Sequence, residues 1–95
     1  MMDIARSDIV RSIAGRDQGK LFFVIDTDGE FLMLADGKHR RVERMKRKKR
    51  KHTAFVAHSN SPVSTRIRSE EKVTNCELRR TLAVFGENGN PDQEG

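Results

Sequence analysis

The fold of this 95-residue chain depends most on residues 21–37, LFFVIDTDGEFLMLADG. Residues 21–25 form a continuous apolar run rich in aromatic and β-branched side chains, which predicts a strand buried on both faces. Residues 31–35 predict a second strand. The pairs Asp28-Gly29 and Asp36-Gly37 follow these runs, and Asp-Gly favours tight hairpins because both residues tolerate positive φ angles. Residues 21–37 therefore predict the centre of a meander.

Shorter segments on both sides extend this sheet. Residues 8–13 alternate polar and apolar side chains, as expected of a half-buried strand. Residues 39–42 and 54–57 predict two further short strands. Five short strands in about fifty residues predict a mainly β fold closed into a small barrel.

A helix is predicted near the C-terminus. Residues 74–77, Thr-Asn-Cys-Glu, match a capping box, in which the Thr hydroxyl and the Glu carboxylate each accept a backbone N–H of the first turn. Leu78, Leu82 and Phe85 then recur on one helical face, and Gly86 is placed to end the helix. One amphipathic helix is therefore expected to pack on the barrel.

The chain is long enough for one small domain. We expect the barrel over residues 1–58, including a basic loop at 43–52, and the helix over residues 73–86. Residues 59–72 are rich in Ser, Asn, Pro and Thr and predict a linker loop, whereas residues 87–95 are almost free of apolar side chains and predict a disordered tail.

Positive charge is concentrated in residues 38–51, where ten of fourteen residues are Lys or Arg and one is acidic. This segment carries +9, whereas the rest of the chain, with nine basic and thirteen acidic residues, sums to −4. Such a local patch is typical of a protein that meets a polyanion. Because six like charges in a row repel each other, residues 46–51 are expected to form a flexible loop.

A glycine-containing loop separates the first two predicted strands. It reads Gly15-Arg16-Asp17-Gln18-Gly19-Lys20. Gly15 and Gly19 permit unusual backbone angles, and Arg16 and Lys20 place positive charge at the rim. With its flanking hydrophobic strands, this string resembles the KOW motif of many ribosomal and transcription proteins.

The resemblance covers about residues 7–53. In order and spacing they are similar to small bacterial KOW-domain RNA-binding proteins and to KOW-containing large-subunit ribosomal proteins of archaea and eukaryotes. Ser7 departs from the pattern, because many members have glycine there. The resemblance implies an SH3-like five-stranded barrel that binds RNA, often ribosomal RNA, through loops and basic side chains.

Residue types and resemblance together predict an RNA-binding site made of cations, with Gly15 and Gly19 shaping the loop that presents part of it. Lys and Arg bind phosphates by Coulomb attraction and counterion release. The predicted contacts are Arg16, Lys20, Lys38, Arg40, Arg41, Arg44, Lys46, Arg47, Lys48, Lys49, Arg50, Lys51 and His52. The chain has no Trp or Tyr, and four of its five Phe lie in predicted strands, so structured RNA is favoured over a single strand stacked on aromatics.

Other partners fit the same patch. A protein-interaction adaptor that docks on a ribosomal or transcription-complex subunit is the main alternative, with the basic run only assisting. Ribosomal proteins are possible additional partners, DNA is a third candidate ligand, and residues 46–51 also suit a nuclear-import signal.

Other classes of function are disfavoured. We find no catalytic constellation, no nucleotide-binding loop and no sign of a cofactor or small-molecule substrate. His39, His52, His58 and Cys76 lack the spacing of a metal site. The single cysteine and the absence of an N-terminal apolar stretch indicate a cytoplasmic protein, and no apolar run is long enough to span a membrane.

Overall fold

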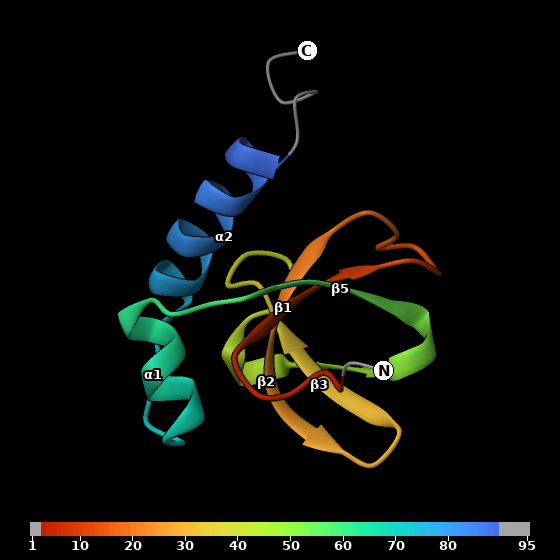
Figure 1. Cartoon of the computed structure of the whole chain (residues 1–95), viewed down its shortest axis with the longest axis horizontal. Helices are drawn as coiled ribbons and strands as arrows, with labels where there is room; N and C mark the ends of the chain where they lie inside the picture. The colour runs from red at the N-terminus through yellow and green to blue at the C-terminus, as the bar shows by residue number, and fades with distance from the viewer. Residues whose placement is uncertain (1–2, 90–95) are drawn as a thin grey trace.

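The computed structural model of the protein describes residues 3–89 (Figure 1). It is a mainly β domain with one five-stranded antiparallel sheet and two α-helices, which confirms the predicted class. The strands are β1 (Asp8–Ser12), β2 (Leu21–Asp28), β3 (Phe31–Ala35), β4 (Lys46–Lys49) and β5 (Thr53–His58). The helices are α1 (Pro62–Arg68) and α2 (Asn75–Gly89), with two short 3₁₀ helices, η1 (Val42–Arg44) and η2 (Arg50–His52).

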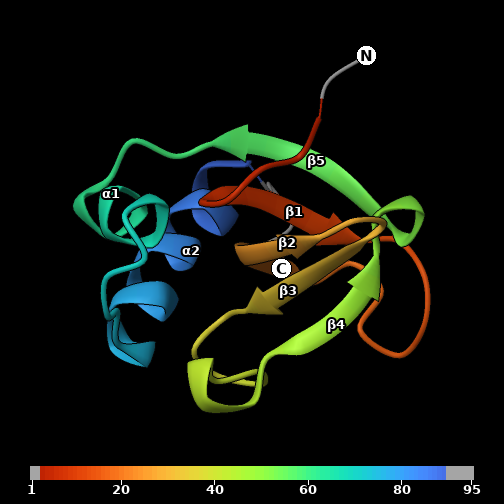
Figure 2. The ribbon, with the colours of Figure 1, turned by 90° about the horizontal axis from the view of Figure 1, so that it is seen from below.

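The sheet has the order β4-β3-β2-β1-β5, so the last strand returns to lie beside the first (Figure 2). The predicted tight hairpin joins β2 and β3, where Asp28 pairs with Phe31 across Gly29 and Glu30. Register shifts between Ile9 and Val10 and between Val24 and Asp26 mark irregularities that bend the strands. Among the described residues β4 and β5 are the two free edges of the sheet, so the predicted closed barrel is not confirmed.

Apolar side chains fill both faces of the central strands. Phe22 and Phe23 are adjacent and fully buried, and because neighbouring residues of a strand point to opposite faces, each enters a different core. One core contains sheet residues only: Val10, Phe22, Val24, Leu32 and Leu34. The other combines the sheet with both helices: Ile9, Phe23, Ala35, Val63, Ile67, Val73, Leu78 and Leu82. The prediction that residues 21–25 form a strand buried on both faces is confirmed at its centre.

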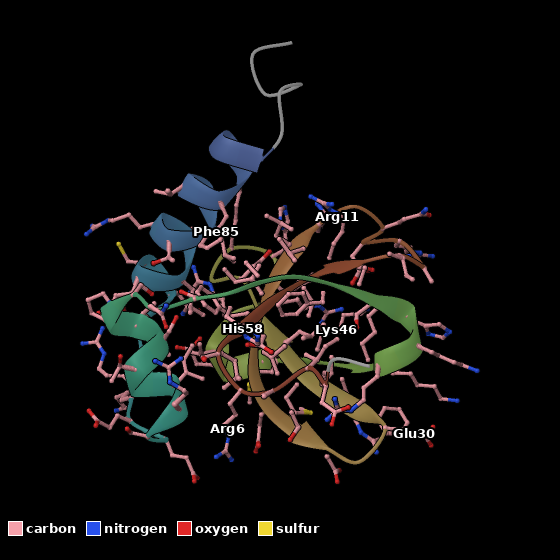
Figure 3. The ribbon with its side chains drawn as sticks, viewed as in Figure 1. Arg6, Arg11, Glu30, Lys46, His58 and Phe85 are labelled. Carbon is pink, nitrogen blue, oxygen red and sulfur yellow. The ribbon has the colours of Figure 1, made fainter. Side chains whose placement is uncertain are left out.

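Helix α2 begins with the predicted capping box. The Glu77 N–H donates to the Thr74 hydroxyl at 3.2 Å, and the Thr74 N–H donates to Glu77 Oε1 at 2.9 Å. Leu78 and Leu82 are buried against the sheet, and Phe85 packs beside them (Figure 3). The helix continues to Gly89, so the predicted end at Gly86 is wrong, because glycine can adopt helical angles at a cost of only about 1 kcal/mol.

That continuation also places residues 87–89 in a helix and not in a tail. The rest of the predicted tail, residues 90–95, lies outside the described residues.

The predicted linker loop at residues 59–72 contains helix α1, so that prediction is wrong over residues 62–68. Ser61 caps this helix by accepting the N–H of Ser64, and Pro62 occupies the start of the helix, where its missing N–H costs nothing. Val63 and Ile67 lie one turn apart and are both buried in the mixed core. Burial of these two side chains against the sheet stabilises a helix that is too short to be stable alone.

The fourth strand also differs from the prediction. Residues 39–42 are not a strand; they belong to the β3–β4 loop (residues 36–45), in which the Asp36 carboxylate accepts the N–H groups of Lys38 and Arg40. Strand β4 lies instead inside the basic run, paired with β3 from Phe31↔Lys49 to Leu34↔Lys46. The prediction of a flexible loop at residues 46–51 is therefore wrong, because these residues form β4 and most of η2.

Candidate nucleic-acid interface

The glycine loop (residues 15–20) has the backbone that its two glycines predict. Gly15 has φ +86° and Gly19 has φ +93°, angles that side chains other than glycine rarely adopt. A Cβ at Gly19 would meet no atom within 4 Å, so the positive φ, and not a close neighbour, requires the glycine there. Backbone hydrogen bonds join the loop ends, from Ser12 N to Lys20 O at 2.9 Å and from Gly19 N to Ser12 O at 2.8 Å.

Asp17 anchors this loop to the sheet through both carboxylate oxygens. Oδ1 accepts from the Ser12 hydroxyl at 2.7 Å and from Lys48 Nζ at 3.1 Å, and Oδ2 lies 3.4 Å from Lys46 Nζ. Burial would raise the pKa of Asp17, but the Ser12 hydrogen bond and the two lysines outweigh it and lower the pKa to about 2. The carboxylate is therefore ionised at neutral pH, and its negative charge partly neutralises Lys46 and Lys48 of the basic run.

Lys48 has a structural role that the sequence does not reveal. Its side chain is only 9% exposed, and Nζ donates to the Ala14 carbonyl at 2.9 Å as well as to Asp17. Arg50 is also bound internally, donating to the carbonyls of Gly29 and Ile4 at 2.7 Å each. These two predicted RNA contacts thus join β4 and η2 to the rest of the domain.

Replacing Lys48 with alanine is expected to lower the free energy of unfolding by about 2–4 kcal/mol, because it leaves Asp17 partly buried without its closest cation. Lys51, an exposed cation of the same run, is the control, and its replacement should change stability by less than about 0.5 kcal/mol. Urea unfolding of both variants measures the difference. Equal stability of the two variants would show that the Lys48 contacts contribute nothing.

The β3–β4 loop is held in place by the start of α2. Asn75 Oδ1 accepts the N–H of Val42 at 2.8 Å, and Asn75 Nδ2 donates to the Glu43 carboxylate at 3.0 Å. Arg79 donates to the Gly37 carbonyl at 2.8 Å. The helix therefore fixes a loop whose own residues are mostly charged and exposed.

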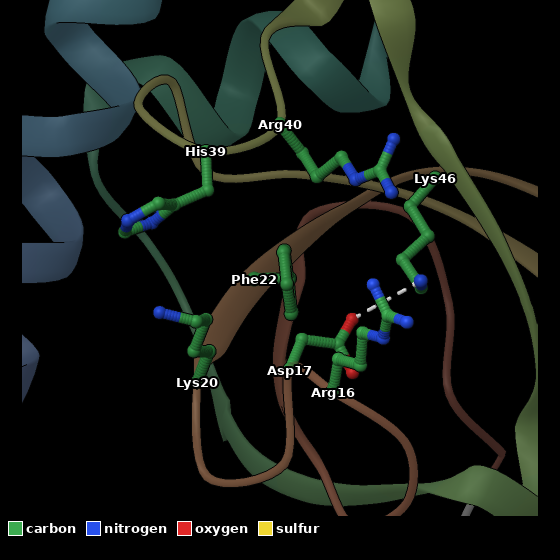
Figure 4. Close-up of a pocket in the computed structure, with 7 residues that line it drawn as sticks. All are labelled: Arg16, Asp17, Lys20, Phe22, His39, Arg40 and Lys46. Carbon is green, nitrogen blue, oxygen red and sulfur yellow. Dashed lines mark ion pairs between the residues drawn. The ribbon is translucent and has the colours of Figure 1, made fainter.

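The glycine loop and the β3–β4 loop meet around an open hollow of about 350 Å³ (Figure 4). Asp17 and Phe22 form part of its lining. The rest of the lining consists of four cationic side chains and an imidazole: Arg16, Lys20, Arg40, Lys46 and His39. A second hollow of about 540 Å³ shares His39 and Arg40 and is lined in addition by Lys38, Arg41, Glu43 and Arg44. The two hollows thus adjoin at the β3–β4 loop.

The cationic surface is defined here as the seven Lys and Arg side chains of these hollows: Arg16, Lys20, Lys38, Arg40, Arg41, Arg44 and Lys46. The two carboxylates in the lining of these hollows are already engaged, since Asp17 binds Lys46 and Lys48 and Glu43 binds Asn75. The Asn75 hydrogen bond lowers the pKa of Glu43, with a smaller contribution from Arg41. Such a surface can bind several phosphates of a polyanion.

The remaining predicted contacts lie elsewhere. Arg47 and Lys49 alternate with Lys46 and Lys48 along β4 and so lie on its other face. Lys51 and His52 belong to η2. Sequence reasoning missed His39, which lines both hollows, and the anchoring role of Asp17. Lys38 and Arg40 on either side of His39 are the sequence signal that could have indicated His39 as a site residue. The role of Asp17 could not be predicted in this way, because it depends on contacts between residues that are distant in sequence.

Comparisons with known proteins assign no family. No family model matches the sequence, and no curated protein matches it. Over residues 3–89, no three His, Cys, Asp or Glu side chains lie close enough to hold a metal ion. Within the same part of the chain, neither helix has the length and apolar character needed to cross a membrane.

Proposed function

We propose that the protein binds structured RNA, with ribosomal RNA as the expected ligand, through the cationic surface. The observation that carries the proposal is the meeting of the glycine loop with the β3–β4 loop around one hollow, which brings together cations from residues 16 to 46. Neutralised phosphates release their counterions, which gives affinity without base discrimination. The proposed setting is the cytoplasm.

The fold supports the KOW resemblance on which the choice of RNA partly depends. A sheet whose last strand lies beside its first has the order of a small barrel opened along one seam, and its bulged strands curve around the sheet-only core. Ser7, which stands where many KOW proteins carry glycine, has φ +72°, a conformation that favours glycine. We therefore propose an SH3-like barrel of the KOW type.

The chemistry of the surface favours phosphate recognition over base recognition. Phe22 is the one phenylalanine in the lining of the two hollows, and it is fully buried, with 0% of its surface accessible to solvent. Bases therefore have little ring area to stack on at this surface, whereas seven long cations can follow a folded phosphate backbone.

The surface is tested by a double variant, Arg16→Ala with Arg40→Ala. These two side chains come from different loops, are exposed, and make no hydrogen bond or ion pair within residues 3–89. We expect the affinity for an RNA hairpin at about 0.1 M salt to fall roughly thirty- to a hundredfold, since two phosphate contacts are lost. Thermal stability should stay within about 0.5 kcal/mol of the parent.

The matched control is Lys72→Ala with Arg80→Ala, which removes the same charge from exposed positions outside both hollows. It should leave affinity within about threefold of the parent. Equal losses in both variants would show that only net charge matters. Full RNA binding by the Arg16/Arg40 variant would favour the adaptor alternative, in which the domain docks on a protein subunit.

A further inference from the structure

The ring of Phe31, outside the cationic surface, lies under a cation. The Arg47 guanidinium lies over the Phe31 ring, with its central carbon 3.7 Å from the ring centroid. The two residues lie diagonally across the β3–β4 pair, in which Phe31 is opposite Lys49 and Met33 is opposite Arg47. Phe31 is half-buried, and Arg47 is exposed. The ring therefore covers one side of the guanidinium, and the opposite side lies away from the ring.

That outer face has no partner within the protein. Within residues 3–89, the Arg47 side chain forms no hydrogen bond and no ion pair, unlike the side chains of its neighbours Lys46 and Lys48, which both bind Asp17. Two acids lie close to Phe31, and neither is ion-paired with Arg47: Asp28 pairs with Phe31 across the β2–β3 hairpin, and Glu30 precedes it at the tip of that hairpin (Figure 3). A planar guanidinium that lies over a ring and is left without a hydrogen bond is suited to stack on a second flat group.

The position of Arg47 relates this stack to the cationic surface. Strand β4 is an edge of the sheet, and its successive side chains point to opposite faces, so Lys46 faces the hollow while Arg47 and Lys49 face the other side. A nucleic-acid strand that crosses this edge can place a phosphate near Lys46 and the following base near Arg47. Lys49 lies about 7 Å further along the same face, within reach of the next phosphate.

We infer that Arg47 and Phe31 form a stacking site for one unpaired nucleobase of the bound RNA. The base lies on the outer face of the guanidinium, so that ring, guanidinium and base form a three-layer stack. This inference rests on the proposed RNA-binding function and adds to it a preference for RNA with an unpaired base next to a helix. The site recognises the flat face of a base and not its edges, so it tolerates any of the four bases.

Arg47→Lys tests the inference because it keeps the charge and removes the flat group. The probes are a hairpin RNA with 2-aminopurine in its loop and a blunt duplex of the same stem. We expect Arg47→Lys to weaken hairpin binding about tenfold and to leave duplex binding within about twofold of the parent. Quenching of 2-aminopurine fluorescence, expected with the parent, should be lost.

Two further variants complete the test. Phe31→Leu keeps an apolar side chain but removes the ring, and it should reproduce the selective loss for the hairpin; its fold is checked by circular dichroism. Arg11→Lys, the same substitution at an exposed site of β1, should change neither affinity. Equal weakening of hairpin and duplex by Arg47→Lys, or no change in either, would overturn the stacking site while leaving RNA binding intact. A parent protein that binds neither probe would instead overturn the proposed function itself.

Discussion

Replacing Gly37 with alanine is expected to destabilise the protein by about 3 kcal/mol or more. Two independent causes add at this position. Gly37 has φ +80°, which strains any residue with a Cβ, and an added Cβ would overlap the backbone carbonyl of Asn75 at the start of α2. The atom in the way belongs to the backbone in the first turn of a capped helix. It therefore cannot move aside unless the helix or the loop shifts.

Gly29→Ala is the matched control for Gly37→Ala. Gly29 also has a positive φ, +61°, but a Cβ there would meet no atom within 4 Å. We expect a loss of only about 1–2 kcal/mol from backbone strain. Thermal unfolding should separate the two variants by at least roughly 5 °C, since 1 kcal/mol shifts the melting temperature of a domain this size by about 4–8 °C. Equal melting temperatures would contradict the close contact between the β3–β4 loop and α2.

RNA affinity is expected to fall about a thousandfold between roughly 50 and 200 mM salt. The cationic surface holds seven Lys and Arg side chains, so about six phosphate contacts are available to a folded RNA. Each contact contributes just under one unit to the slope of log affinity against log salt, and six contacts over a fourfold change in salt give the thousandfold loss. Fluorescence anisotropy with a labelled hairpin RNA measures this slope directly.

Local patterns predicted the central sheet and the start of α2 well. The boundaries of β3 agree with residues 31–35, and the capping box at Thr74 and Glu77 forms as expected. These features depend on neighbouring residues, whose apolar spacing and capping chemistry can be read directly. Strand β4 escaped prediction because its sequence, KRKK, has no apolar alternation, and its pairing depends on β3 and on the burial of Lys48 beside Asp17.

The same distinction holds for the candidate site. The residue types and the glycine loop could be predicted, but which cations are free to meet a ligand could not. Lys48 and Arg50 resemble Lys51 in sequence, and only contacts with Ala14, Asp17, Gly29 and Ile4 show that they are engaged in the fold. Helix α1 was missed for a related reason: its short length hides the period, although Ser61-Pro62 is a signal for a helix start.

The most direct test of the proposed interface compares salt slopes among three proteins: the parent, the Arg16/Arg40 double alanine variant and the Lys72/Arg80 double alanine variant. If the cationic surface binds RNA phosphates, the slope of log affinity against log salt should fall by about 1.5 to 2 units in the Arg16/Arg40 variant and stay unchanged in the Lys72/Arg80 variant. A parent slope near zero, or the same slope in all three proteins, would contradict the assignment of this surface to RNA.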